Sequence, residues 1–197
     1  LELSEGKVLI SGLEGKTPLA EIGFVATGPV AAGVGLLYSP PFNFTQNFDL
    51  KPEMFGGQMA VRALFAFPLQ AAIDQTDFRF SAAANIANFE LKSGIGGYTV
   101  SDGSLVTLID GNGINVEGRI KVAGVPSNVI WKKRFRGTGS ELSNLSVTMT
   151  LDDEERRKLD LPKFPWLKGP VSASGEFLTK DGAILNGVLA LDLTTAR

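Results

Sequence analysis

Residues 98–135 constrain the fold of this 197-residue chain most strongly, because apolar and polar residues alternate along them with the period of a β-strand. In the middle of the stretch, one parity is apolar and the other is polar: Ile114, Val116, Ile120 and Val122 alternate with Asn115, Glu117, Arg119 and Lys121. The Asp-Gly-Asn-Gly sequence at 110–113 and the Ala-Gly pair at 123–124 are typical of tight turns. We therefore predict three antiparallel strands with one apolar face.

Further strands are predicted where the alternation recurs, at residues 3–10, 19–27, 57–67, 77–91, 145–151, 171–178 and 183–193. Within 77–91 the apolar parity changes before Phe89 and Leu91, so we expect a β-bulge near Ala87 and Asn88. Most of the connections are tight turns between strands that follow one another in the sequence. Nine to eleven strands joined in this way favour an antiparallel meander.

Two or three short helices are predicted between the strands. Pro29 suits the first position of a helix, and residues 30–38 are apolar up to a Ser-Pro-Pro stop. A second helical turn is expected around residues 50–55. Asp152 is a suitable N-cap for a third helix, in which acidic residues precede basic ones and so complement the helix dipole.

The fold class is thus mainly β, and the pattern is compatible with two architectures. A β-sandwich with a dry core is the simpler interpretation of alternation alone. The alternative is one long, curved antiparallel sheet with an open apolar groove, because three short helices are few to cover so long a sheet. We expect residues 1–197 to form a single domain and to be a fragment of a larger protein, since there is no initiator methionine and Leu1 begins inside an expected strand.

The composition excludes several classes of enzyme. The chain has no histidine and no cysteine, which rules out His-based triads, His-ligated zinc and thiolate nucleophiles. Asp102 and Asp110 each precede a glycine, as is typical of turns, and Glu117 has the polar parity of a strand. A net charge of −2 gives no electrostatic footprint for nucleic acid. We therefore expect no catalytic residue, no metal site and no cofactor.

Four stretches carry a resemblance to a known family: residues 26–42 (ATGPVAAGVGLLYSPPF), 42–69, 97–135 (GYTVSDGSLVTLIDGNGINVEGRIKVAGVPSNVIWKKRF) and 147–177. On these patterns of turns and spacing, the chain resembles the AsmA-like envelope proteins of Gram-negative bacteria, and more closely their YhdP-type branch. The resemblance covers about residues 17–193. It implies a periplasmic segment of a larger protein that is anchored in the inner membrane through other parts. It also implies a curled sheet that shelters phospholipid acyl chains between the two membranes, without enzyme activity.

A groove of this kind needs an apolar lining, because acyl chains form no hydrogen bonds. The family has no fixed site motif, so alternation supplies the candidates for the lining: Met59, Val61, Phe65, Phe67, Phe78, Phe80, Ile114, Val116, Ile120 and Val122. The basic residues Lys132, Lys133 and Arg134 are candidates for lipid headgroups, although a solvated strand end is the simpler interpretation. The expected partners are a phospholipid or another acyl lipid and the remainder of the same polypeptide. The alternative function is a structural or protein-interaction domain of the envelope with a dry core and no ligand.

Overall fold

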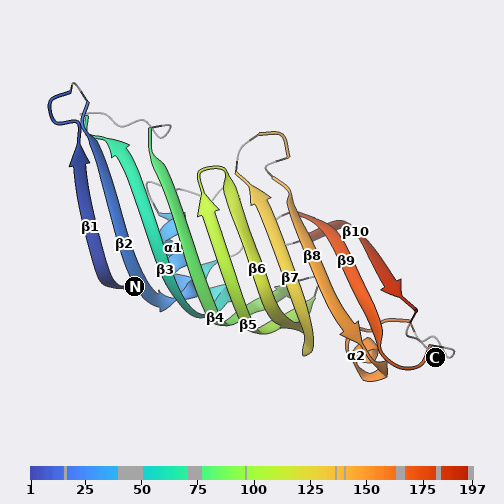
Figure 1. The fold of residues 1–197 in the computed structure, drawn as a ribbon. Coiled ribbons are helices and arrows are strands. Elements are labelled where there is room, and N and C mark those ends of the chain that lie inside the picture. The colour runs from blue at the N-terminus through green and yellow to red at the C-terminus, as the bar shows by residue number, and fades with distance from the viewer. Residues whose placement is uncertain are drawn as a thin grey trace.

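The computed structural model describes residues 1–15, 17–39, 51–70, 77–95, 97–135, 137–139, 141–162, 167–180 and 183–194. These residues form one antiparallel sheet of ten strands that follow one another in sequence order (Figure 1). The sheet is open, because its first and last strands do not pair with each other. The strands are β1 (Glu2–Ser11), β2 (Leu19–Pro29), β3 (Phe55–Pro68), β4 (Arg79–Ile95), β5 (Tyr98–Asp110), β6 (Gly113–Val122), β7 (Val125–Arg134), β8 (Ser143–Leu151), β9 (Val171–Lys180) and β10 (Ala183–Asp192).

Two short α-helices accompany the sheet, as the sequence predicts. Helix α1 (Val30–Tyr38) begins directly after Pro29 and ends before the Ser-Pro-Pro segment, and α2 (Asp153–Lys158) follows Asp152. The helical turn expected around residues 50–55 is a 3-10 turn, η2 (Pro52–Met54). Residue 50 lies outside the described residues. In Figure 1, α1 lies behind β3, so the front of the sheet in that view is free of helices at this end.

Strand register places one residue of every strand in a single row across the sheet. Residues that are paired in an antiparallel sheet share a face. The row therefore lies on one face, and it consists of Leu3, Ala26, Val61, Ala84, Thr107, Val116, Trp131, Leu145, Phe177 and Gly187. Nearly all of these residues are apolar. We call this side of the sheet the inner face and the opposite side the outer face.

A line of irregular residues crosses β3, β4 and β5 and bends the sheet. Asn88 has a positive φ of 53° and lies where the pairing of β4 shifts register, which confirms the predicted bulge. Gly57 on β3 lies against Asn88 with φ 103°, and Asp102 on β5 has φ 52° next to Gly103, which pairs with Phe89. The expectation of a turn at Asp102 was wrong, because Asp-Gly here forms a bulge within β5. We call this line the crease.

The core lies on the inner face. One cluster of buried residues spans the middle strands and includes Leu91, Val100, Leu105, Ile120, Val129 and Leu145. A second cluster lies at the end of the sheet near α2, where Leu159 packs on Val125, Leu151 and Ala173. The described residues contain no second sheet, so the sandwich alternative is not observed in this part of the chain. The architecture is the open meander.

Candidate functional site: the inner face of the sheet

All ten predicted groove residues lie on the inner face. Strand pairing aligns Met59, Val61 and Phe65 of β3 with Ile86, Ala84 and Phe80 of β4, and Phe67 with Ala20 of β2. In β6, Ile114, Val116, Ile120 and Val122 pair with residues of the same face on β7. Ile120 is buried, and the other nine are partly exposed. Alternation was therefore sufficient to place these side chains on one face, although their strands are distant in the sequence.

Four phenylalanine rings from β2, β3 and the residues before β4 form an aromatic cluster on this face. The ring centroids of Phe24 and Phe65 are 5.5 Å apart, those of Phe65 and Phe78 are 5.7 Å apart, and those of Phe67 and Phe78 are 6.0 Å apart. Such distances are typical of stacked and tilted aromatic pairs. Phe24 is not among the predicted groove residues, although the alternation of residues 19–27 gives it the same face as Ala20 and Ala26.

Five polar side chains interrupt the apolar surface. Ser143 Oγ and Thr179 Oγ1 are 2.7 Å apart and share a buried hydrogen bond between β8 and β9. Ser127 Oγ donates to the Val125 carbonyl at 3.0 Å. Thr107 Oγ1 is buried at the centre of the sheet without a hydrogen-bond partner among the described residues. The fifth is Lys133, which is only 5% exposed.

The three basic candidates for headgroup contact are divided between the two faces. Lys133 pairs with Ile114 and lies on the inner face, where its Nζ donates to the Glu141 carbonyl at 3.3 Å. Lys132 and Arg134 are exposed on the outer face and line a shallow hollow together with Arg62. The three side chains therefore do not form one site. The alternation within the basic run was sufficient to predict this separation.

The two helices cover separate parts of the inner face. Gly33 of α1 lies directly on the end of the Met59 side chain, so a β-carbon at residue 33 would displace the Met59 sulfur and methyl group. At the other end, Leu159 follows α2 and is buried against the sheet, and its carbonyl accepts a hydrogen bond from the Tyr98 hydroxyl at 2.9 Å. Met59, the groove candidate nearest the start of β3, is consequently a contact of α1.

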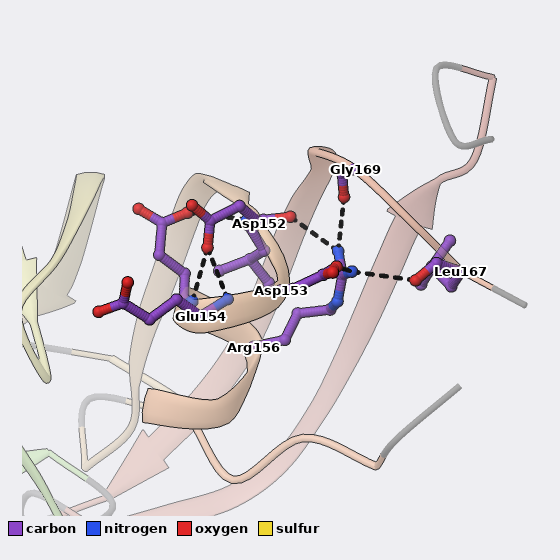
Figure 2. A network of polar contacts seen from close by, with 8 residues as sticks. Asp152, Asp153, Glu154, Arg156, Leu167 and Gly169 are labelled. Atoms are coloured by element: carbon purple, nitrogen blue, oxygen red, sulfur yellow. Dashed lines mark hydrogen bonds and ion pairs between the residues drawn. The ribbon is translucent and has the colours of Figure 1, made fainter. Parts of the chain in front are cut away.

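Hydrogen bonds between side chains and backbone groups stabilise helix α2 (Figure 2). Asp152 Oδ1 accepts from the amides of Glu154 and Glu155, each at 2.8 Å. These hydrogen bonds, chiefly the one from Glu155, lower the pKa of Asp152. The Asp152 amide in turn donates to Glu155 Oε2 at 2.8 Å, which completes a capping box.

Arg156 connects α2 to the chain segments on both sides of it. Its guanidinium donates to the carbonyls of Leu151 and Gly169 at 2.9 Å and to that of Leu167 at 3.1 Å, and it also contacts Asp153. Figure 2 shows the guanidinium between the helix and the segment that leads into β9. Arg156 is buried, whereas its neighbour Arg157 is exposed. Sequence reasoning did not single out Arg156, because three basic residues follow one another in this helix.

The three carboxylates considered in the sequence analysis lie in a turn, in an exposed ion pair and on the outer face. Asp110 Oδ1 accepts from the amides of Asn112 at 2.7 Å and Gly113 at 3.1 Å, which confirms the predicted turn. Asp102 forms an exposed ion pair of 2.9 Å with Lys121. Glu117 is exposed on the outer face. Within the described ranges, acidic residues do not gather in a group of three or more that would hold a metal ion.

Comparisons with protein-family models, with curated proteins and with solved structures find no match to this chain. The resemblance to AsmA-like proteins therefore depends on the four sequence stretches alone. Among the described helices, none has the length and apolar character needed to cross a membrane. The candidate site is thus defined by the geometry of the inner face.

Proposed function

We propose that this chain binds the acyl chains of a phospholipid or a similar lipid on its inner face. In this proposal it is a non-catalytic segment of a periplasmic, AsmA-like protein that is anchored in the inner membrane elsewhere and carries lipid between the membranes. The observation that supports the proposal is the row of mainly apolar residues that crosses all ten strands of an open sheet. Part of this row remains accessible, since Val61, Val116, Trp131 and Phe177 are half-buried and Leu3 is 71% exposed. Apolar side chains left accessible together on one face commonly mark a site for a ligand or a partner.

The chemistry of the inner face suits acyl chains. Methylene groups need no hydrogen bonds, and each one removed from water contributes about 0.8 kcal/mol. The aromatic cluster offers flat apolar rings at one end, and the neighbouring inner-face residues Ala82 and Ala84 of β4 are also apolar. Of the three basic candidates, only Lys133 shares a face with these residues, and because it is 5% exposed and its Nζ donates to the Glu141 carbonyl, we assign no headgroup contact to it.

A photo-crosslinking amino acid on either face of the sheet tests the proposal. Phe80 lies on the inner face and pairs with Phe65. Leu64, which precedes Phe65 in β3, lies on the outer face and is 46% exposed. The protein would be produced in the periplasm of a Gram-negative bacterium with the crosslinker at one of these positions, irradiated and examined by mass spectrometry. We expect covalent phospholipid at position 80 and little at position 64.

Equal labelling at the two positions, or none at position 80, would contradict lipid binding. Native mass spectrometry of the unmodified protein provides an independent measurement, in which we expect co-purified phospholipid. A protein that carries no phospholipid and does not bind a fluorescent fatty acid would favour the second candidate function, a structural or protein-interaction domain. The apolar residues exposed on the two edge strands, such as Leu3 and Val188, support that alternative.

A further inference from the structure

The outer face of the sheet carries a compact group of side chains that donate hydrogen bonds. Strand pairing places Lys132 of β7 between Asn115 of β6 and Asn144 of β8, so the three residues lie in one row of this face. Paired residues of this kind have Cβ atoms about 4.5–5.5 Å apart. Arg134 lies on the same face two residues along β7, about 7 Å from Lys132 between Cα atoms. Two cations and two amides are therefore close neighbours, and we call these four residues the donor group.

The donor group lines a hollow in the middle of the sheet. The hollow has a volume of about 940 Å³ and extends from Arg62 on β3 to Leu178 on β9. Strands β6, β7 and β8 each pair with a strand on both sides, so the surroundings of the donor group do not depend on either edge of the sheet. Lys132, Arg134 and Asn144 are exposed, and a small molecule in the hollow can therefore reach them.

Carboxylates of the described residues do not neutralise the charge of the donor group. None of the ion pairs in this part of the chain includes Lys132 or Arg134. Asp110 also lines the hollow, but its Oδ1 accepts hydrogen bonds from two backbone amides of its own turn. Asn115 Oδ1 has no hydrogen-bond partner among the described residues, although buried polar atoms are usually paired. Charge and hydrogen-bonding capacity in the hollow are thus unused by the protein itself.

We propose that the donor group binds the phosphoryl group of a phosphate ester. An ammonium, a guanidinium and two amides offer more donors than the two oxygens of a carboxylate need, whereas a phosphoryl group presents three terminal oxygens and up to two charges. Leu108, which pairs with Asn115, and Leu64 line the same hollow and are 52% and 46% exposed. The apolar part of the ester lies on these leucines. The occupant is therefore a small amphiphile, distinct from any lipid on the inner face.

Isothermal titration calorimetry with three probes tests the proposal. We expect hexyl phosphate to bind more tightly than inorganic phosphate, which lacks an apolar part, and more tightly than hexanoate, which has fewer acceptors. Lys132→Gln and Arg134→Gln should each weaken the binding of hexyl phosphate by about tenfold, as expected for the loss of a hydrogen bond between charged groups. Arg79→Gln is the matched control, because Arg79 is exposed on the outer face of β4 but lies outside the hollow. It should change the affinity by less than about twofold, since salt screens distant charges.

Monomeric dihexanoyl phosphatidic acid distinguishes the two sources of such a group. Tighter binding than hexyl phosphate would support a lipid headgroup as the occupant, and weaker binding would support a soluble phosphate ester. Three results would each overturn the proposal: no saturable binding of either ester, equal loss of affinity in Arg79→Gln and Lys132→Gln, or hexanoate binding as tightly as hexyl phosphate. Circular dichroism would verify that the variants are folded. Crosslinking at position 80 reports on the opposite face, so its outcome is separate from these measurements.

Discussion

Replacement of Arg156 by methionine should destabilise the protein markedly, because Arg156 joins three chain segments. Methionine keeps an unbranched apolar stem but leaves the carbonyls of Leu151, Leu167 and Gly169 without their donor. A hydrogen bond to a charged group contributes about 1.5–3 kcal/mol, and bonds from one side chain are not additive. We therefore expect the free energy of unfolding to fall by about 3 kcal/mol.

Equilibrium unfolding in urea, followed by far-ultraviolet circular dichroism, measures this change. With a denaturant dependence of about 2 kcal/mol per molar urea, the midpoint should fall by roughly 1.5 M. Arg157→Met is the control, because Arg157 is exposed in the same helix and substitution there should change stability by less than about 0.5 kcal/mol. Arg156→Lys should lie between the wild type and Arg156→Met, since an ammonium group lacks the fork of the guanidinium. Similar midpoints for Arg156→Met and Arg157→Met would refute the reasoning.

Three further predictions concern the bends, the helix cap and the buried hydroxyls. Gly57→Ala should lower the free energy of unfolding by about 2 kcal/mol, because its β-carbon would lie 2.7 Å from the Asn88 carbonyl oxygen at a φ of 103°. Gly23→Ala is the control, since its β-carbon would make only ordinary contacts, and the thermal midpoint should fall in the first variant and change little in the second. Because folding lowers the pKa of Asp152, its ionised carboxylate stabilises α2 fully above pH 3.8, and this stabilisation is lost as the pH falls through the lowered pKa of the folded protein. Asp152→Asn should therefore remove this part of the acid sensitivity in a pH titration of unfolding. Thr107→Val should stabilise the protein by about 1 kcal/mol, because the Thr107 hydroxyl has no hydrogen-bond partner among the described residues. Thr179→Val should destabilise it by a similar amount, and equal effects of the two changes in urea unfolding would contradict this.

Local patterns in the sequence predicted most of the fold. Alternation located the strands, Pro29 and Asp152 located the starts of α1 and α2, and the change of parity before Phe89 located the bulge at Asn88. Each of these features depends on residues within a few positions of one another. The turn expected at Asp102 failed because Asp-Gly favours a positive φ in a bulge as readily as in a turn.

Features that depend on distant residues were not predictable. Alternation gives an apolar face in a sandwich and in an open sheet alike, so it could not distinguish between the two. The burial of Arg156 depends on three carbonyls that lie 5, 11 and 13 residues away, and nothing in the basic run of α2 distinguishes it from Arg157. The division of Lys132, Lys133 and Arg134 between the faces, in contrast, follows from the period of two and was available from the sequence.

The order of the strands has a consequence for how such a sheet forms and grows. Each strand pairs with its sequence neighbours alone, and most pairings close a short loop at a small entropic cost. The connections from β2 to β3 and from β8 to β9, which contain α1 and α2, are longer. Stability then approximates a sum over adjacent interfaces, as in a repeat protein. Each added strand extends the inner row by about 4.8 Å and leaves the other interfaces unchanged. The number of strands therefore determines how far the apolar inner face extends across the sheet.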